Sequence, residues 1–308
     1  MEEFEDYSMD QFPFRDSFRR IKAIARYDFL RLRDNNGIYI ENGFAAGIIH
    51  PLNESSVLHA AAKFTEIHDI WLEDANRIIV SIIPDKGFFL SKANGYPSMD
   101  YKRLEQLLTE NMPFAQYCNI MDTLSINNYY KTDTHWIQES IFPTAEYIAS
   151  ALDSDPVSEY TVHETEVDFY GVYYGQSALP LLPDKIRYIT SDAISAAVVY
   201  NDETGSTGGV YDPEKLHSKD PYEFFLSGAS AVLTIENPLS ENDRKLVMFR
   251  DSFGSSIAPF FIDGYSQITL VDTRYISPSL LGDYVDFTDC DVLFLYSTLV
   301  LNESQSLK

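Results

Sequence analysis

A serine, a histidine and an aspartate in two short polar motifs could form a nucleophilic catalytic site. Ser252 lies in FRDSFGSS, directly after the apolar run KLVMF, and Asp133 and His135 lie in KTDTHW. A neutral imidazole can take a proton from a serine hydroxyl, and a carboxylate can hold the imidazole in the tautomer that does so. These residue types are therefore typical of acyl transfer through a serine ester.

The position of Ser252 between a predicted strand and a predicted helix suits a nucleophile. In α/β enzymes such a serine follows the carboxyl end of a strand, where backbone N–H groups can stabilise an oxyanion. Gly254 would let the backbone pass close by. Alternatively, Ser252 could be an ordinary helix N-cap. Asp133 and His135 could equally be a chance pair in a polar loop.

Other kinds of chemical site find little support in the sequence. No second histidine or acidic residue stands at a usual metal-ligand spacing from Asp133 and His135, so we expect no metal site. Cys118 and Cys290 lie in apolar contexts outside any zinc or redox spacing, which predicts buried free thiols. The glycine-rich ETGSTGGVYD lacks the Gly-Lys-Ser/Thr of a P-loop. We therefore expect no cofactor.

Composition and charge limit the class of protein. Of the 308 residues, 45% are hydrophobic and 23% are charged, which is usual for globular domains. The net charge of −24 opposes binding to nucleic acid or to an anionic membrane. No apolar run reaches the roughly 18 residues of a membrane span. The acidic start is not a signal peptide, so either the protein is cytosolic or an exporting segment lies outside this sequence.

Alternating strands and helices must position the two motifs. Apolar residues at helical spacing predict helices over 55–71, 99–111 and 138–152. Continuous apolar runs predict strands over 77–84, 245–249, 267–272 and 291–297. Shorter elements are expected as a partly helical opening over 4–33, a hairpin over 36–52, a strand near 118–122 and a helix over 278–285. This order is typical of an α/β fold whose parallel sheet is covered on both faces.

Residues 153–240 differ in composition from the rest of the chain. They are rich in tyrosine, threonine, glycine and proline, and VDFYGVYYG, KIRYIT and SAAVVYN predict short strands. We predict a β-rich insertion or cap within a single domain that spans residues 1–308. Its Tyr170, Tyr173 and Tyr174 could stack on sugar rings, or they could belong to the sheet surface and core.

Taken together, the motifs resemble the DHHW family. YYKTDTHW, followed roughly 115 residues later by VMFRDSFGSSIAPFF and ITLVDTRY, is similar to that family, which is related to the alginate O-acetyltransferase proteins of the SGNH-hydrolase superfamily. The opening FEDYSMDQFPFRDSF and IPDK at 83–86 also resemble these proteins. The similarity therefore extends from near residue 4 to near residue 302.

The resemblance implies a catalytic triad. It makes Ser252 the nucleophile, His135 its base and Asp133 the acid that orients the base. Thr134 stands where the family name has its first histidine, and related acetyltransferase proteins also have threonine there. Lys86, in the IPDK turn, is structural or points into the site.

The resemblance also implies residues that bind the substrate or the oxyanion. Arg274 and Tyr275 match a recurring pair that could contact substrate. Alternatively, Arg274 could form a structural salt bridge, or Tyr275 could place its hydroxyl in the core. Asn302 is the candidate for a second oxyanion donor. Independently of the resemblance, Trp136 beside His135 could wall the site. Arg250 stands where superfamily members usually have glycine, so it could shape the pocket, obstruct it or attract an anionic group.

These matches lead to an expected fold and function. The fold would be a three-layer α/β/α, SGNH-hydrolase-like (flavodoxin-like) arrangement with the β-rich insertion. The function would be that of a bacterial O-acetyltransferase or acetylesterase acting on O-acetyl groups of a cell-surface or secreted polysaccharide, with no cofactor. The alternative, motivated by Arg250 and the tyrosines, is a non-catalytic carbohydrate-binding or polysaccharide-assembly protein with a degenerate site.

The resemblance implies partners and a location as well. The expected partners are a polysaccharide or oligosaccharide substrate and an acetyl donor, which a membrane acyl-transport partner could supply. The expected location is extracytoplasmic, with secretion or membrane anchoring through an N-terminal segment outside this sequence.

Overall fold

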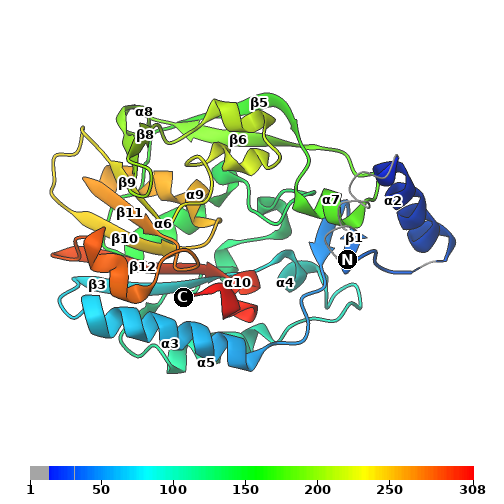
Figure 1. The fold of residues 1–308 in the computed structure, drawn as a ribbon, viewed down its shortest axis with the longest axis horizontal. Helices are drawn as coiled ribbons and strands as arrows, with labels where there is room; N and C mark the ends of the chain where they lie inside the picture. The colour runs from blue at the N-terminus through cyan, green and yellow to red at the C-terminus, as the bar shows by residue number, and fades with distance from the viewer. Residues whose placement is uncertain (1–13, 31) are drawn as a thin grey trace, which may run out of the picture.

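An eight-stranded sheet forms the centre of the protein in the computed structural model, which describes residues 14–30 and 32–308 (Figure 1). Across the sheet the strands are β4 (Gln116–Tyr117), β3 (Arg77–Ile83), β12 (Cys290–Ser297), β10 (Lys245–Arg250), β11 (Gln267–Val271), β9 (Val232–Glu236), β7 (Val198–Asn201) and β8 (Ser206–Gly208). The first five strands run parallel, and β9 is antiparallel to both β11 and β7. The predicted α/β fold with a mostly parallel sheet is confirmed.

Helices pack against both faces of this sheet. Figure 1 shows α3 (Glu54–Trp71) and α5 (Tyr101–Glu110) together on one side of the strands. Val247 and Phe249 of β10 share one apolar core with these helices, whereas Leu246 and Met248 share the other with α6 (Phe142–Ala151). Because alternate side chains of β10 enter two cores, the strand is apolar along its whole length.

Most of the predicted main elements occupy their predicted positions. The helix predicted over 138–152 begins as the 3₁₀ turn η4 (Gln138–Ile141), and α6 follows with a proline in its first turn, where the missing N–H costs nothing. The strand expected near 118–122 lies earlier, as β4, and the 3₁₀ turn η2 (Met121–Thr123) takes its place. Near the end of the chain, the predicted 278–285 helix is the 3₁₀ segment η8 (Pro278–Asp283).

Residues 153–240 contribute to two sheets. The strands β7, β8 and β9 extend the central sheet, while β5 (Thr161–Phe169) and β6 (Asp184–Thr190) form a separate antiparallel ribbon. The VYYG part of the predicted strand VDFYGVYYG is helical instead, in α7 (Val172–Ser177). Two further short turns of this stretch are α8 (Asp192–Ala196) and η6 (Pro221–Phe224).

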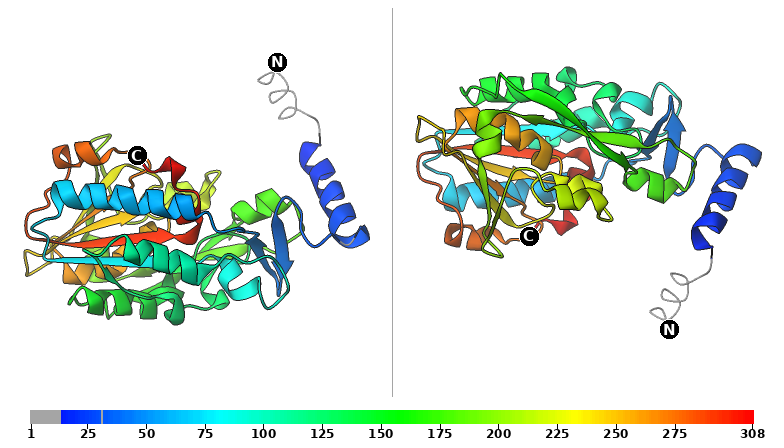
Figure 2. Two further views of the ribbon diagram at one scale, coloured as in Figure 1. Left: turned by 90° about the horizontal axis from the view of Figure 1, so that it is seen from below. Right: turned by 90° about the horizontal axis from the view of Figure 1, so that it is seen from above.

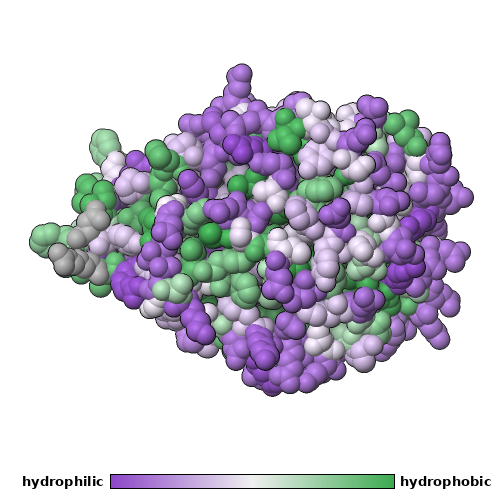
Figure 3. All heavy atoms as spheres, turned by 180° about the vertical axis from the view of Figure 1, so that it is seen from behind, coloured by the Kyte–Doolittle hydropathy of each residue, from purple (hydrophilic) through white to green (hydrophobic). Residues whose placement is uncertain are grey.

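The N-terminal part of the described chain projects from the body as α2 (Arg15–Ile24) and the π-helical η1 (Ala25–Phe29) (Figure 2). Apolar side chains gather at this tip in Figure 3, and Phe14, Ile21 and Phe29 are more than half exposed. The first part of the opening predicted over 4–33 lies outside the described residues. The hairpin that follows, β1 (Ile38–Glu41) and β2 (Phe44–Gly47), confirms its prediction.

Three short helices follow neighbouring strands at one edge of the sheet. They are α4 (Lys86–Leu90) after β3, α9 (Gly254–Ile257) after β10 and α10 (Thr298–Asn302) after β12. Since these strands are adjacent and parallel, their carboxyl ends meet. Over residues 14–30 and 32–308, no helix combines the length and apolarity needed to cross a bilayer.

Candidate active site

The two sequence motifs meet at the carboxyl edge of the sheet. Ser252 lies in the turn between β10 and α9, and His135 and Asp133 lie in the loop 130–136 that precedes α6. His135 Nε2 is 2.8 Å from Ser252 Oγ, and His135 Nδ1 is 2.5 Å from Asp133 Oδ1. The hydroxyl, imidazole and carboxylate therefore form one continuous hydrogen-bonded chain, which is the geometry that a serine nucleophile requires.

Asp133 is held as an ionised acceptor. Its Oδ1 also accepts the His135 backbone N–H at 2.9 Å, and its Oδ2 accepts the Val172 N–H at 2.8 Å. Burial raises the pKa of Asp133, but the adjacent His135 and these hydrogen bonds outweigh burial and lower the pKa to about 2. A carboxylate charged at neutral pH favours a proton on Nδ1, which leaves Nε2 to accept the proton of Ser252.

Aromatic rings hold the imidazole of His135 in place. Tyr222 of η6 stacks on it, with ring centroids 3.7 Å apart and planes 8° from parallel, and Phe253 lies at 4.7 Å. The Tyr222 hydroxyl and Trp136 Nε1 each lie 2.8 Å from Ser256 Oγ. Trp136 is fully buried, so it supports the site from inside the protein rather than walling a pocket. These contacts limit the rotation of His135 away from Ser252.

The turn that carries Ser252 is tied to the neighbouring strand by a buried carboxylate. Asp251 Oδ1 accepts the Phe253 N–H at 3.0 Å, and Oδ2 accepts the Ser297 N–H at 2.8 Å. The Gly254 N–H donates to the Asp251 carbonyl at 3.0 Å. The position of Ser252 is therefore fixed relative to both β10 and β12.

Arg250 lies inside the protein rather than over Ser252. It is 1% exposed, its stem packs against Gly254, and its Nη1 is 3.9 Å from Asp272. Because it is buried, Arg250 neither lines nor obstructs an open pocket, contrary to the expectation from sequence. Arg274 donates two hydrogen bonds to the same Asp272, at 2.9 and 2.6 Å, which is the structural salt bridge weighed as its alternative.

Two other predicted residues have their contacts away from the triad. Asn302 Oδ1 accepts the Asn53 N–H at 2.8 Å, and its Nδ2 donates to the Pro51 carbonyl at 3.3 Å. Both ends of the amide thus join α10 to the start of α3, which disfavours the predicted role as an oxyanion donor. Tyr275 is 47% exposed, with the Arg274 guanidinium 5.6 Å from its ring centroid, so it is not a core hydroxyl.

Residues 153–240 supply supporting groups that the sequence did not single out. Asp184 accepts hydrogen bonds from the Lys131 N–H and from both the N–H and the hydroxyl of Thr132. The Thr132 hydroxyl in turn accepts the Gly171 N–H at 3.1 Å. Gly171 carried the only local signal, because a glycine inside a predicted strand often marks a close backbone approach.

A cavity of about 430 Å³ is lined by residues next to Asp133 rather than by Ser252, His135 or Asp133 themselves. Its lining includes Gly171 and Val172, which contact Asp133, together with Tyr170 and Tyr174. Tyr173 is buried instead, which agrees with its interpretation as a core residue.

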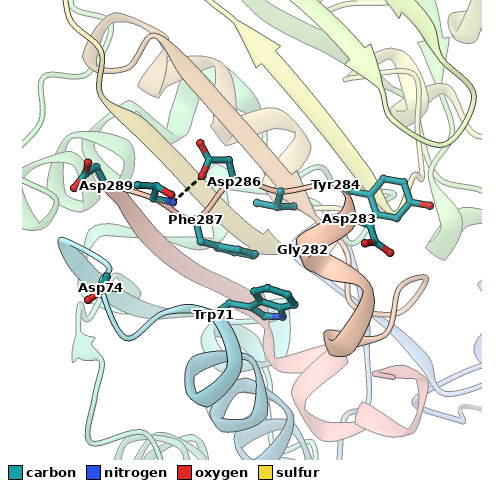
Figure 4. A pocket seen from close by; sticks show the side chains of 10 residues that line it. Trp71, Asp74, Gly282, Asp283, Tyr284, Asp286, Phe287 and Asp289 are labelled. Atoms are coloured by element: carbon teal, nitrogen blue, oxygen red, sulfur yellow. Dashed lines mark hydrogen bonds between the residues drawn. The ribbon is translucent and has the colours of Figure 1, made fainter.

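A larger cavity, of about 880 Å³, lies at the opposite end of the sheet (Figure 4). Its walls include Trp71 and Phe287 and several aspartates. These residues precede β3 and β12, so the cavity is remote from the triad. Within the described ranges, no cluster of His, Cys, Asp or Glu could hold a metal ion. Cys118 and Cys290 are buried free thiols, which confirms that prediction.

Known structures share this fold. A DHHW family protein from Eubacterium siraeum gives a TM-score of 0.69 at 20% identity over 87% of this chain and 93% of that chain. PatB1 from Bacillus cereus, in a structure with a sulfonyl adduct, gives 0.67 at 16% over 86% and 95%. The O-acetyltransferase domain of Pseudomonas putida AlgJ gives 0.52 at 11% over 86% and 92%.

Compared by sequence, the chain matches no family model and no curated protein. The structural similarities, at 20% identity and below, show the fold. The chain therefore has the fold of a DHHW family protein, and the resemblance to that family and to the related O-acetyltransferases is confirmed.

Proposed function

We propose that the protein is an SGNH-like serine acyltransferase or acetylesterase of the three-layer α/β/α class. The observation that carries the proposal is the hydrogen-bonded chain from Ser252 through His135 to Asp133. The shared fold with an O-acetyltransferase domain supports acyl chemistry. The sulfonyl adduct of PatB1 supports a reactive nucleophile in this fold.

The proposed reaction passes through an acetyl-serine. Ser252 Oγ attacks the carbonyl carbon of an acetyl ester while His135 Nε2 takes the hydroxyl proton, and the Ser252 N–H stabilises the oxyanion. The tetrahedral intermediate then collapses, and His135 returns the proton to the departing alkoxide. A sugar hydroxyl or water attacks the acetyl-enzyme, giving up its proton to His135, and free Ser252 is regenerated.

The substrate, partners and setting belong to the same proposal. The substrate is a cell-surface or secreted polysaccharide, modified outside the cytoplasmic membrane with acetyl groups from a donor that a membrane partner provides. The chain is a single domain of residues 1–308, in which 153–240 is a β-rich insertion that also supports the triad. The contacts of Asp184, Gly171 and Tyr222 support that last point.

The test of the proposal is the detection of an acetyl group on Ser252. The protein is incubated with p-nitrophenyl acetate and quenched in acid, and peptides are mapped by mass spectrometry. Acetyl-Ser252 that decays with free acetate supports an esterase, and acetyl transfer to an added oligosaccharide supports a transferase. Steady hydrolysis at the background rate, with no acetyl-serine, contradicts the proposal and favours the non-catalytic carbohydrate-binding alternative.

Gly171→Ala should lower kcat/KM for p-nitrophenyl acetate by roughly 100-fold or more, because displacement of the triad acid by about 1 Å has that effect. A Cβ at this position would lie 2.2 Å from Asp133 Cβ and 2.5 Å from Asp133 Cα, so Asp133 must move. Gly175→Ala, within the helix α7 that Gly171 precedes, is the matched control, since its Cβ would meet nothing within 4 Å. Equal activities in the two folded variants would contradict this account of Gly171.

A further inference from the structure

A lysine is enclosed beneath the loop that carries the triad acid and base. Lys86, the first residue of α4, is 2% exposed. Its Nζ donates to the Tyr130 carbonyl at 2.8 Å and to the Lys131 carbonyl at 3.2 Å, and it lies 5.1 Å from the ring centroid of Tyr173. These two carbonyls directly precede the TDTH segment, so the contact fixes the backbone where the triad loop begins.

The surroundings of this amine indicate a specific use for it. Burial lowers the pKa of Lys86 to about 7, while the negative charges of Asp133 and Asp184 raise it. A methionine could fill similar space without the cost of burying an ammonium group. What methionine lacks is the N–H donors and the positive charge, and both act here on the loop that contains Asp133.

We infer that Lys86 is a positioning residue for the proposed acyl transfer: it holds residues 130–133 so that Asp133 and His135 meet Ser252 in line. The inference rests on the proposed function. Lys86 acts through the two carbonyls and through its charge toward Asp133. Because the side chain is enclosed, it is not assigned a contact with substrate.

Lys86→Met should lower kcat for p-nitrophenyl acetate by roughly 10- to 100-fold and leave KM nearly unchanged, since the ester does not contact this side chain. Lys92→Met is the matched control, because Lys92 follows the same helix and is exposed, and it should keep wild-type kcat. A loss confined to KM, or equal kcat in the two folded variants, would overturn the inference.

A second readout does not depend on activity. The proton between His135 Nδ1 and Asp133 Oδ1 should give a downfield proton NMR resonance, assigned by its absence in Asp133→Asn. In a Ser252→Ala background, Lys86→Met should shift or broaden this resonance, and Lys92→Met should not. If acetyl transfer is absent but Lys86→Met moves the resonance, the proposed function fails and the positioning role stands. If Lys86→Met leaves the resonance unmoved, the positioning role is overturned.

The pH dependence of stability checks the environment of Lys86. The pKa is about 7 in the folded protein, against an ordinary value of 10.5, so between these values the unfolded chain binds more protons. The free energy of unfolding of the wild type should therefore rise relative to that of Lys86→Met from about pH 7 to about pH 10. Urea denaturation of both proteins at several pH values measures this difference, and a constant difference would contradict the lowered pKa of Lys86 in the folded protein.

Discussion

Ser252→Ala should lower the turnover of p-nitrophenyl acetate by at least about 10⁴-fold and abolish the acetylated peptide. The reason is that, within residues 14–30 and 32–308, the hydroxyl bonded to His135 Nε2 is that of Ser252, at 2.8 Å. In a serine triad the loss of the nucleophile alone lowers kcat nearly as much as the loss of all three residues. Steady-state kinetics and peptide mapping measure the two outcomes.

The matched control for that experiment is Ser255→Ala. Ser255 is buried in α9, the short helix that follows Ser252, so its replacement removes a nearby serine without removing the proposed nucleophile. We expect it to retain activity within a few-fold of the wild type. If Ser252→Ala and Ser255→Ala hydrolyse the ester equally, hydrolysis does not use the triad.

Asp133→Asn should lower kcat by roughly 10³- to 10⁴-fold while the protein stays folded. The Asp133 carboxylate accepts from three N–H groups, two of His135 and one of Val172. An asparagine offers one acceptor oxygen, so its NH₂ group must face a donor or force His135 into the wrong tautomer. Replacement of the exposed Asp122 by Asn is the control for the loss of one negative charge.

The wild-type pH profile and the kcat of Asp133→Asn together test the role of the Asp133 carboxylate. Because the pKa of Asp133 is about 2, its ionisation should leave no limb in the wild-type profile above about pH 4. A kcat of Asp133→Asn close to that of the wild type would show that the carboxylate is not needed to orient His135. Circular dichroism and urea denaturation confirm that the variant protein is folded.

Local sequence was sufficient to predict the elements that hold Ser252. The runs KLVMF and DVLFLYS are apolar throughout because both faces of β10 and β12 are covered, and such runs are visible without a structure. The D-x-H and D-S motifs each follow a predicted strand, which is compatible with Ser252 and His135 at one edge of a parallel sheet. The relevant information in both cases lies within a few neighbouring residues.

The partners of single polar residues could not be predicted in the same way. Asn302 follows the last strand at the correct edge, but its amide bonds to Asn53 and Pro51, some 250 residues earlier in the chain. Arg250 was expected near the pocket, but its side chain is buried against Asp272. Such contacts depend on which distant segments of the chain pack together, and the spacing of residues in the sequence does not indicate this.

The support that residues 153–240 give to the triad has a consequence for engineering. Gly171 lies against Asp133, and Tyr222 stacks on His135. A tyrosine-rich segment far along the chain therefore contacts and supports both Asp133 and His135. A hybrid that exchanges this segment for that of a relative would exchange the supports of both residues at once. The loop 130–136 and residues 169–222 should therefore be transplanted together or not at all.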